Sequence, residues 1–147
     1  MSFAQQVADC CGFLADEYGF RFAGEDHRVG EVVEYVKEPL TVYFGWYKGE
    51  IDIHVSLSLA HAANHAVFRP YLSRSFALRE LALRQNPQAF ADWAQRYPKA
   101  EYVTTPAQAA QWLGEWAAIM RRYCAPILAG DLALLEQITR ERRAAQR

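Results

Sequence analysis

No stretch of this 147-residue sequence is both long and apolar enough to cross a membrane, which takes about 20 consecutive apolar residues. The N-terminal segment MSFAQQVADCC also lacks the basic start and apolar centre of a secretory signal. These two absences predict a soluble, cytoplasmic protein without a membrane partner.

Cysteine is scarce: the chain has three, at Cys10, Cys11 and Cys124. An adjacent pair and one distant residue form neither a CxxC pair nor an even disulfide framework. We therefore expect three reduced thiols, which agrees with a cytoplasmic protein. Cys124 falls in an apolar helical pattern and is expected to be a small core residue.

Recognisable catalytic signatures are also missing. None of the serines that could act as a nucleophile lies in a G-x-S-x-G turn: Ser56, Ser58, Ser73 and Ser75. The glycines are scattered, so no phosphate-binding loop is present, and no motif places a pair of carboxylates for acid–base work. The sequence indicates no cofactor and favours a non-enzymatic protein, although it leaves the question open.

A strong positive charge is absent as well. The net charge of −1 argues against a general nucleic-acid binder. The charge is unevenly divided: residues 1–72 hold five Lys/Arg against ten Asp/Glu, a net of −5, and residues 73–147 hold eleven against seven, a net of +4. The simplest interpretation of the basic half is a solvated helical surface.

The sequence is rich in residues that can form a hydrophobic core, with 52% hydrophobic and 14% aromatic residues. This is enough for a single domain over 1–147. Apolar residues alternate strictly in two runs separated by Lys48-Gly49-Glu50, which is typical of two half-buried strands joined by a hairpin. The runs are Leu40, Val42, Phe44, Trp46 and then Ile51, Ile53, Val55, Leu57.

Glu38-Pro39 interrupts the pattern upstream and leaves 32–37 as a separate first strand. A short extended piece near 20–22 and a polar stretch over 23–30 offer one further edge strand. The fold class predicted is therefore α+β, with a three- to four-stranded antiparallel meander covered on one face by helices.

Helical periodicity accounts for most of the remaining chain. Capping boxes are predicted at Ser2 with Gln5 and at Thr105 with Gln108, the second followed by Pro106. The expected helices cover 2–18, 75–85 from an N-cap at Ser75, 88–97, a long helical region from 105 to about 125, and a final helix after Asp131; residues 60–72 form a long connection with one helical turn near 60–64.

The polar face of the predicted sheet is the candidate binding surface. It displays Tyr43, Tyr47, Asp52, His54 and Ser56, joined by either Glu34 and Val36 or Tyr35 and Lys37, depending on the register. Tyrosines interspersed with a carboxylate and a histidine are typical of protein-binding surfaces. Alternatively, this face is covered by the 60–72 connection or by a second copy of the chain.

Three histidines offer a weaker hypothesis of metal binding. His61 and His65 are spaced i, i+4, which places two imidazoles on one helix face, and His54 on the polar sheet face could supply a third ligand. The glutamate of an HExxH motif is missing. Exposed loop histidines are the simpler interpretation, so no metal is assigned.

The order of several sequence segments resembles that of a known group of proteins. FLADEYGF closes a helix, VEYVKEPLTVYFGW and GEIDIHVSL form a strand pair, and a long helix runs into YCAPILAGDLALL. This layout is similar to small bacterial proteins that resemble the immunity proteins of polymorphic toxin systems. The resemblance implies a bacterial, cytoplasmic, non-enzymatic α+β protein that neutralises a toxin by occlusion, and it transfers no catalytic residues.

Several functions remain open at this point. The leading hypothesis is a protein-binding domain of immunity type, with a toxin-like partner. A self-associating structural or regulatory homodimer is the alternative, followed by a metal-dependent enzyme using His54, His61 and His65, and by a small-molecule pocket between helix and sheet.

Overall fold

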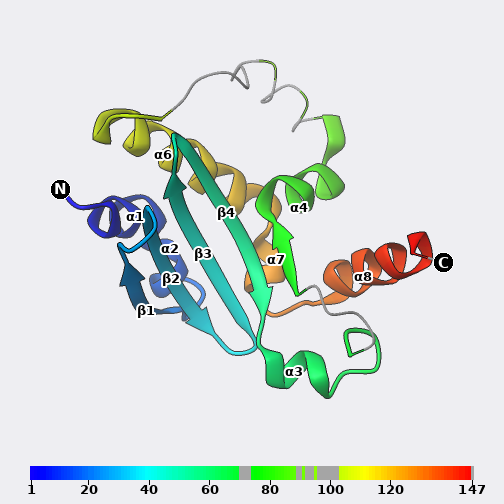
Figure 1. Cartoon of the computed structure of the whole chain (residues 1–147). Coiled ribbons are helices and arrows are strands. Elements are labelled where there is room, and N and C mark those ends of the chain that lie inside the picture. Colours follow the sequence, from blue (N-terminus) through cyan, green and yellow to red (C-terminus); the bar gives the residue numbers. More distant parts are fainter. Residues whose placement is uncertain (70–73, 89–90, 92–94, 96–102, 147) are drawn as a thin grey trace.

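The computed structural model of the chain describes residues 1–69, 74–88, 91, 95 and 103–146. One antiparallel sheet has the strand order β1-β2-β3-β4-β5 and packs against helices (Figure 1). The elements are α1 (Phe3–Cys11), α2 (Phe13–Asp16), β1 (Arg21–Asp26), β2 (Glu31–Lys37), β3 (Leu40–Tyr47), β4 (Glu50–Leu57), α3 (Leu59–Ala63), β5 (Ser75–Ala77), α4 (Leu78–Gln85), α6 (Pro106–Tyr123), α7 (Ala125–Leu128) and α8 (Ala133–Ala145).

The predicted meander is confirmed as β2, β3 and β4. Val42 of β3 lies opposite Tyr35 of β2 and Val55 of β4, so the alternating apolar residues of the three strands share one face. Lys48 and Gly49 connect β3 to β4, and both have positive φ, of 48° and 80°. That backbone matches the twist of the flanking strands, which explains the tight hairpin.

The prediction of three to four strands is wrong, because the sheet has five. β1 pairs with β2 through a bulge between Phe22 and Gly24, which obscures its period-two pattern. The expected helix start at Ser75 is also wrong: residues 75–77 form β5 against β4, with Phe76 buried, and α4 begins only at Leu78. Three residues are too few for alternation to reveal a strand.

Helix ends follow the local sequence closely. The capping boxes at Ser2 with Gln5 and at Thr105 with Gln108 are both present. The single helix expected over 2–18 is instead divided at Gly12 into α1 and α2, because glycine weakens a helix interior. Most of the helix expected over 88–97 lies outside the described residues.

The start of the last helix differs slightly from the prediction. Asp131 is the predicted N-cap, but Leu132 occupies the N-cap position of α8. The Asp131 side chain still accepts a hydrogen bond from the Ala133 backbone N–H at 3.0 Å. The aspartate therefore satisfies one of the free amide groups at this helix end, from one position further out.

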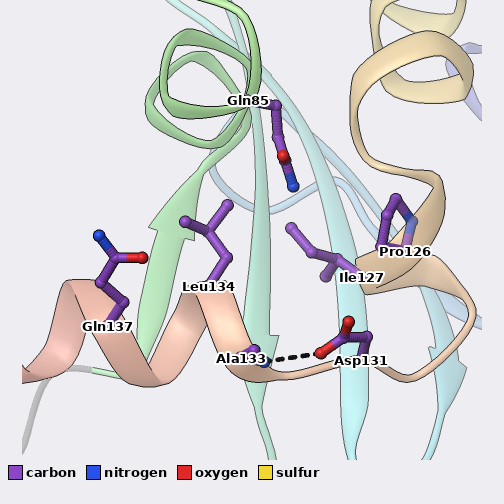
Figure 2. Close-up of a pocket in the computed structure, with 7 residues that line it drawn as sticks. All are labelled: Gln85, Pro126, Ile127, Asp131, Ala133, Leu134 and Gln137. Carbon is purple, nitrogen blue, oxygen red and sulfur yellow. Dashed lines mark hydrogen bonds between the residues drawn. The ribbon is translucent and has the colours of Figure 1, made fainter.

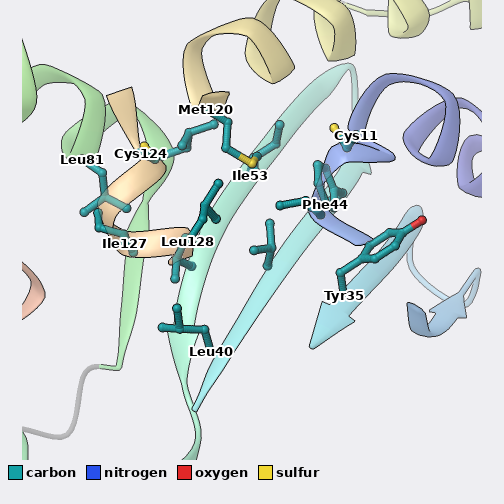
Figure 3. Close-up of a cluster of buried hydrophobic side chains, with 14 of the residues drawn as sticks. Cys11, Tyr35, Leu40, Phe44, Ile53, Leu81, Met120, Cys124, Ile127 and Leu128 are labelled. Atoms are coloured by element: carbon teal, nitrogen blue, oxygen red, sulfur yellow. The ribbon is translucent and has the colours of Figure 1, made fainter. Parts of the chain in front are cut away.

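The helices cover one face of the sheet, as predicted. Figure 3 shows Leu81, Met120, Cys124, Ile127 and Leu128 gathered over side chains from β3 and β4. Cys11 and Cys124 are buried free thiols, and burial raises the pKa of Cys124 to about 12. Such thiols are poorly reactive, because the thiolate is the reactive form.

The connection after β4 lies at one end of the sheet (Figure 1). Its helical turn forms α3, and Phe68 inserts into the hydrophobic core. Within residues 60–69 the connection is anchored to the core by Ala62 and Phe68, and its other side chains are half-buried or exposed; residues 70–73 lie outside the described residues. Among the described helices, none is long and apolar enough to span a membrane.

The core predicts a large difference between two phenylalanines. Phe44 in the middle of β3 is 0% exposed, whereas Phe22 on edge strand β1 is 51% exposed. Phe44→Ala is expected to lower the free energy of unfolding by about 3–5 kcal/mol, because it leaves a cavity. Phe22→Ala should cost no more than about 1.5 kcal/mol, the scale of one aromatic pair.

Urea denaturation of both variants, with a common m-value, measures this difference. Equal losses would contradict the placement of the core on this face of β3.

Candidate functional site

The sheet face opposite the core, here called the outer face, is the candidate site. None of the described helices lies over it (Figure 1). Apart from Gly45, its residues on β2, β3 and β4 are half-buried or exposed. They are Val32, Glu34, Val36, Thr41, Tyr43, Gly45, Tyr47, Glu50, Asp52, His54 and Ser56.

The register decides which β2 residues belong to this face. Glu34 lies opposite Tyr43, so Glu34 and Val36 are on the outer face. Tyr35 is buried in the core cluster, and the Lys37 ammonium donates a hydrogen bond to the Leu128 carbonyl at 2.8 Å. Of the two alternatives that the sequence left open, the first is therefore correct.

Tyr43 and His54 form the centre of the outer face and are here called the aromatic ridge. They are direct cross-strand neighbours on β3 and β4. Their ring centroids are 4.3 Å apart and the planes differ by only 4°, a stacked arrangement. Cross-strand aromatic pairs of this kind stabilise a sheet and fix the orientation of both rings.

Asp52 holds the second ring of the ridge. One of its carboxylate oxygens lies 3.3 Å from His54 Nδ1, and this hydrogen bond lowers the pKa of Asp52. The Asp52 side chain is 65% exposed, whereas that of His54 is 23% exposed. The carboxylate therefore remains accessible while it orients the imidazole.

Gly45 leaves room for the first ring. A Cβ atom on this glycine would lie 2.8 Å from Tyr43 Cε1 and 3.0 Å from the Tyr43 hydroxyl oxygen. The phenol thus leans along β3 and covers the backbone of Gly45, which is why this residue alone of the outer face is buried. An aromatic ring above a strand glycine compensates for the missing side chain.

Three carboxylates surround the Tyr43 phenol. Burial raises the pKa of Tyr43, and the negative charges of Asp52, Glu34 and Asp26 raise it further. Arg28 pairs with Asp26 and lowers the pKa of that carboxyl to about 2. Glu34 has no ion-pair partner in the described part of the chain. The ridge therefore lies in a region of negative potential that the protein itself only partly neutralises.

Tyr47 lies on the same face, at the hairpin end of β3. It is 49% exposed, and the Lys48 ammonium lies 5.3 Å from the centroid of its ring. All four residues predicted for partner binding, Tyr43, Tyr47, Asp52 and His54, are thus on one uncovered surface. Whether they contact a partner stays a prediction.

The histidines suggested for a metal do not converge. His54 contacts Tyr43 and Asp52, whereas the rings of His61 and His65 are 5.4 Å apart beside Phe68. His65 Nε2 also lies 3.3 Å from a Glu136 oxygen on α8. Within the described residues, no group of three or more His, Cys, Asp or Glu could hold a metal ion.

A surface pocket of about 310 Å³ lies on the helical side of the molecule. Figure 2 shows its lining from α4, α7, α8 and the loop between the last two: Gln85, Pro126, Ile127, Asp131, Ala133, Leu134 and Gln137. Among the lining residues that the structure describes, Asp131 is the one titratable group, and its carboxylate accepts a hydrogen bond from the Ala133 backbone N–H. Apart from Asp131, the described lining consists of apolar and amide side chains.

Two members of the site escaped the sequence reasoning. Asp26 belongs to β1, whose bulge hides its pairing, and Gly45 has no side chain to attract notice. Gly45 could have been recognised from its place in an alternating strand, since glycine there often marks a close approach by another group.

Comparison with protein-family models, curated proteins and solved structures gives no match.

The contact over Gly45 predicts that a single methyl group can disrupt the ridge. Gly45→Ala should displace the Tyr43 ring with little loss of stability, because a flexible side chain can move away. The ring protons of His54 should then lose the ring-current shift caused by Tyr43. A ¹H–¹³C NMR spectrum of the histidine rings measures this change, with His65 as the unaffected control, and an unchanged His54 would contradict the stacked geometry.

The carboxylates predict the direction of a pKa change. Asp52→Asn should lower the pKa of Tyr43, because a neighbouring negative charge disfavours tyrosinate. A pH titration of the Tyr43 ¹³Cζ resonance measures it. Glu17→Gln, on the helical side beside Arg121, removes one charge elsewhere and should leave the Tyr43 pKa unchanged. A Tyr43 pKa that rises, or that moves equally in both variants, would refute the proximity of Asp52.

Proposed function

We propose that this chain is a non-enzymatic protein-binding domain that uses its outer face to dock on another protein. The supporting observation is the aromatic ridge, a stacked Tyr43–His54 pair on a sheet face that no described helix covers. An antiparallel sheet commonly has one face packed on the core and one solvated face of polar side chains. Here it presents two oriented rings with accessible carboxylates.

The physical chemistry of the ridge suits a binding hot spot. Tyrosine offers a large contact area at low cost in conformational entropy, and its hydroxyl tolerates both water and a partner. The stack and the Asp52 hydrogen bond restrict the motion of both rings before any partner arrives. Preorganised side chains lose less entropy on binding, which favours affinity.

The sequence resemblance supports a more specific form of this proposal. An immunity-type protein acts by occlusion: it covers a surface that a toxin needs and performs no chemistry itself. A rigid sheet face backed by a helical layer suits that role, because most preorganised complexes form with little backbone movement. Under this proposal the protein acts in the bacterial cytoplasm, beside the toxin that it neutralises.

The test is affinity capture from a lysate of the source cells, comparing wild-type protein with outer-face variants. Tyr43→Ala and Asp52→Ala should each weaken the affinity for a stoichiometric partner on the order of 30-fold, the effect expected of hot-spot residues. Two matched controls change exposed residues on the helical side, Leu83→Ala and Glu17→Ala, and should retain the partner. The captured protein is then purified and its affinity for all five proteins is measured.

Different results would exclude the proposal in different ways. A partner that binds all variants equally would place the binding surface elsewhere. Sedimentation that finds a wild-type dimer and a Tyr43→Ala monomer would identify the outer face as a contact between two copies of this chain.

A further inference from the structure

We infer that the outer face recognises arginine side chains of its partner, which stack on the aromatic ridge and pair with the surrounding carboxylates. This inference rests on the proposed function, and it specifies the chemistry of the partner surface. It follows from the arrangement of side chains in rows across the sheet.

Two adjacent rows of facing residues define the binding surface. The first row crosses all five strands as Gly24, Glu34, Tyr43, His54 and Ala77. The second crosses four strands as Asp26, Val32, Gly45 and Asp52. The ridge is thus flanked by carboxylates on β1, β2 and β4, and small residues lie at both ends of its own row.

The carboxylates of these rows are only partly paired within the protein: Arg28 binds Asp26, and His54 contacts one oxygen of the exposed Asp52. Within the described residues, neither Glu34 nor Arg21 forms an ion pair. Arg21 lies opposite Val36, in the next row of the outer face. Arg28 is bound to Asp26 by two nitrogens, and Lys48 lies over the ring of Tyr47. Glu34 and Asp52 are therefore available to a cation that comes from outside.

The rings of the aromatic ridge favour an arginine guanidinium over a lysine ammonium. A guanidinium is planar, so it can lie against an aromatic face while its N–H groups pair with a carboxylate in two places. A lysine ammonium has the same charge but neither the plane nor the fork. Since Tyr43 has Glu34 as its neighbour on one side and Asp52 diagonally on the other, stacking and bidentate pairing are available together.

Three capped pentapeptides serve as probes, because they separate charge from shape. They have the sequence Gly-X-Gly-X-Gly, with X as arginine, lysine or citrulline; citrulline has the shape of arginine without its charge. Each is titrated into ¹⁵N-labelled full-length protein at low ionic strength, and the amide shifts are followed by NMR. We expect the arginine peptide to bind most tightly, the lysine peptide roughly threefold more weakly, and citrulline not detectably.

The shifts should map to the two rows and disappear in matched variants. Tyr43→Leu keeps an apolar side chain but removes the ring, and Glu34→Gln removes one carboxylate. Each substitution should weaken the affinity for the arginine peptide at least about threefold. Glu17→Gln changes the net charge equally on the helical side and should bind like the wild type. Circular dichroism verifies that all variants are folded.

The outcomes distinguish this inference from the proposed function. If arginine and citrulline peptides bind alike, or if the shifts map to the helical side, arginine recognition is wrong. If the captured partner depends on Tyr43 but the arginine peptide does not bind, the protein-binding function stands and only the inference fails. If the peptide binds as expected but no partner depends on Tyr43, the proposed function fails.

Discussion

The register of β2, β3 and β4 is the constraint on which the rest of the structure depends. Val42 faces Tyr35 and Val55, and this alignment gathers the apolar residues of three strands on one side. A shift by one residue would move Phe44 into solvent and Tyr43 into the core, because side chains alternate between faces. The same alignment that builds the core therefore also brings Tyr43 beside His54 on the outer face.

The helical layer buries the apolar sheet face that the strand register creates. Side chains of α1, α4, α6 and α7 pack on the apolar face. Two ion pairs then join α4 to α8: the half-buried Arg142 lies 2.8 Å from Glu80, and Arg84 pairs with Glu141. Basic residues of the second half of the chain are thus partly neutralised by their own helices. Near the aromatic ridge, in contrast, carboxylates outnumber cations, so the two sides of the molecule differ in electrostatic character.

Much of this arrangement could be predicted from the sequence, wherever a regular pattern was long enough to be recognised. The alternation predicted β3 and β4 correctly, and the capping boxes at Ser2 and Thr105 predicted where α1 and α6 begin. β1 and β5 could not be found in the same way, because a bulge interrupts one and the other has three residues. The four outer-face residues were predicted together, whereas the contributions of Glu34 and Asp26 required the strand pairing.

The carboxylates near Tyr43 differ in what they do for the fold. Asp26 contacts Arg28 and Asp52 contacts His54, and each contact lowers the pKa of the carboxyl, so both ionised groups stabilise the folded chain. Glu34 forms no ion pair within the described residues, and together with Asp52 and Asp26 it raises the pKa of the Tyr43 phenol. An external cation beside Glu34 would bind the folded sheet and not the unfolded chain, so its binding would stabilise the fold as well as the complex.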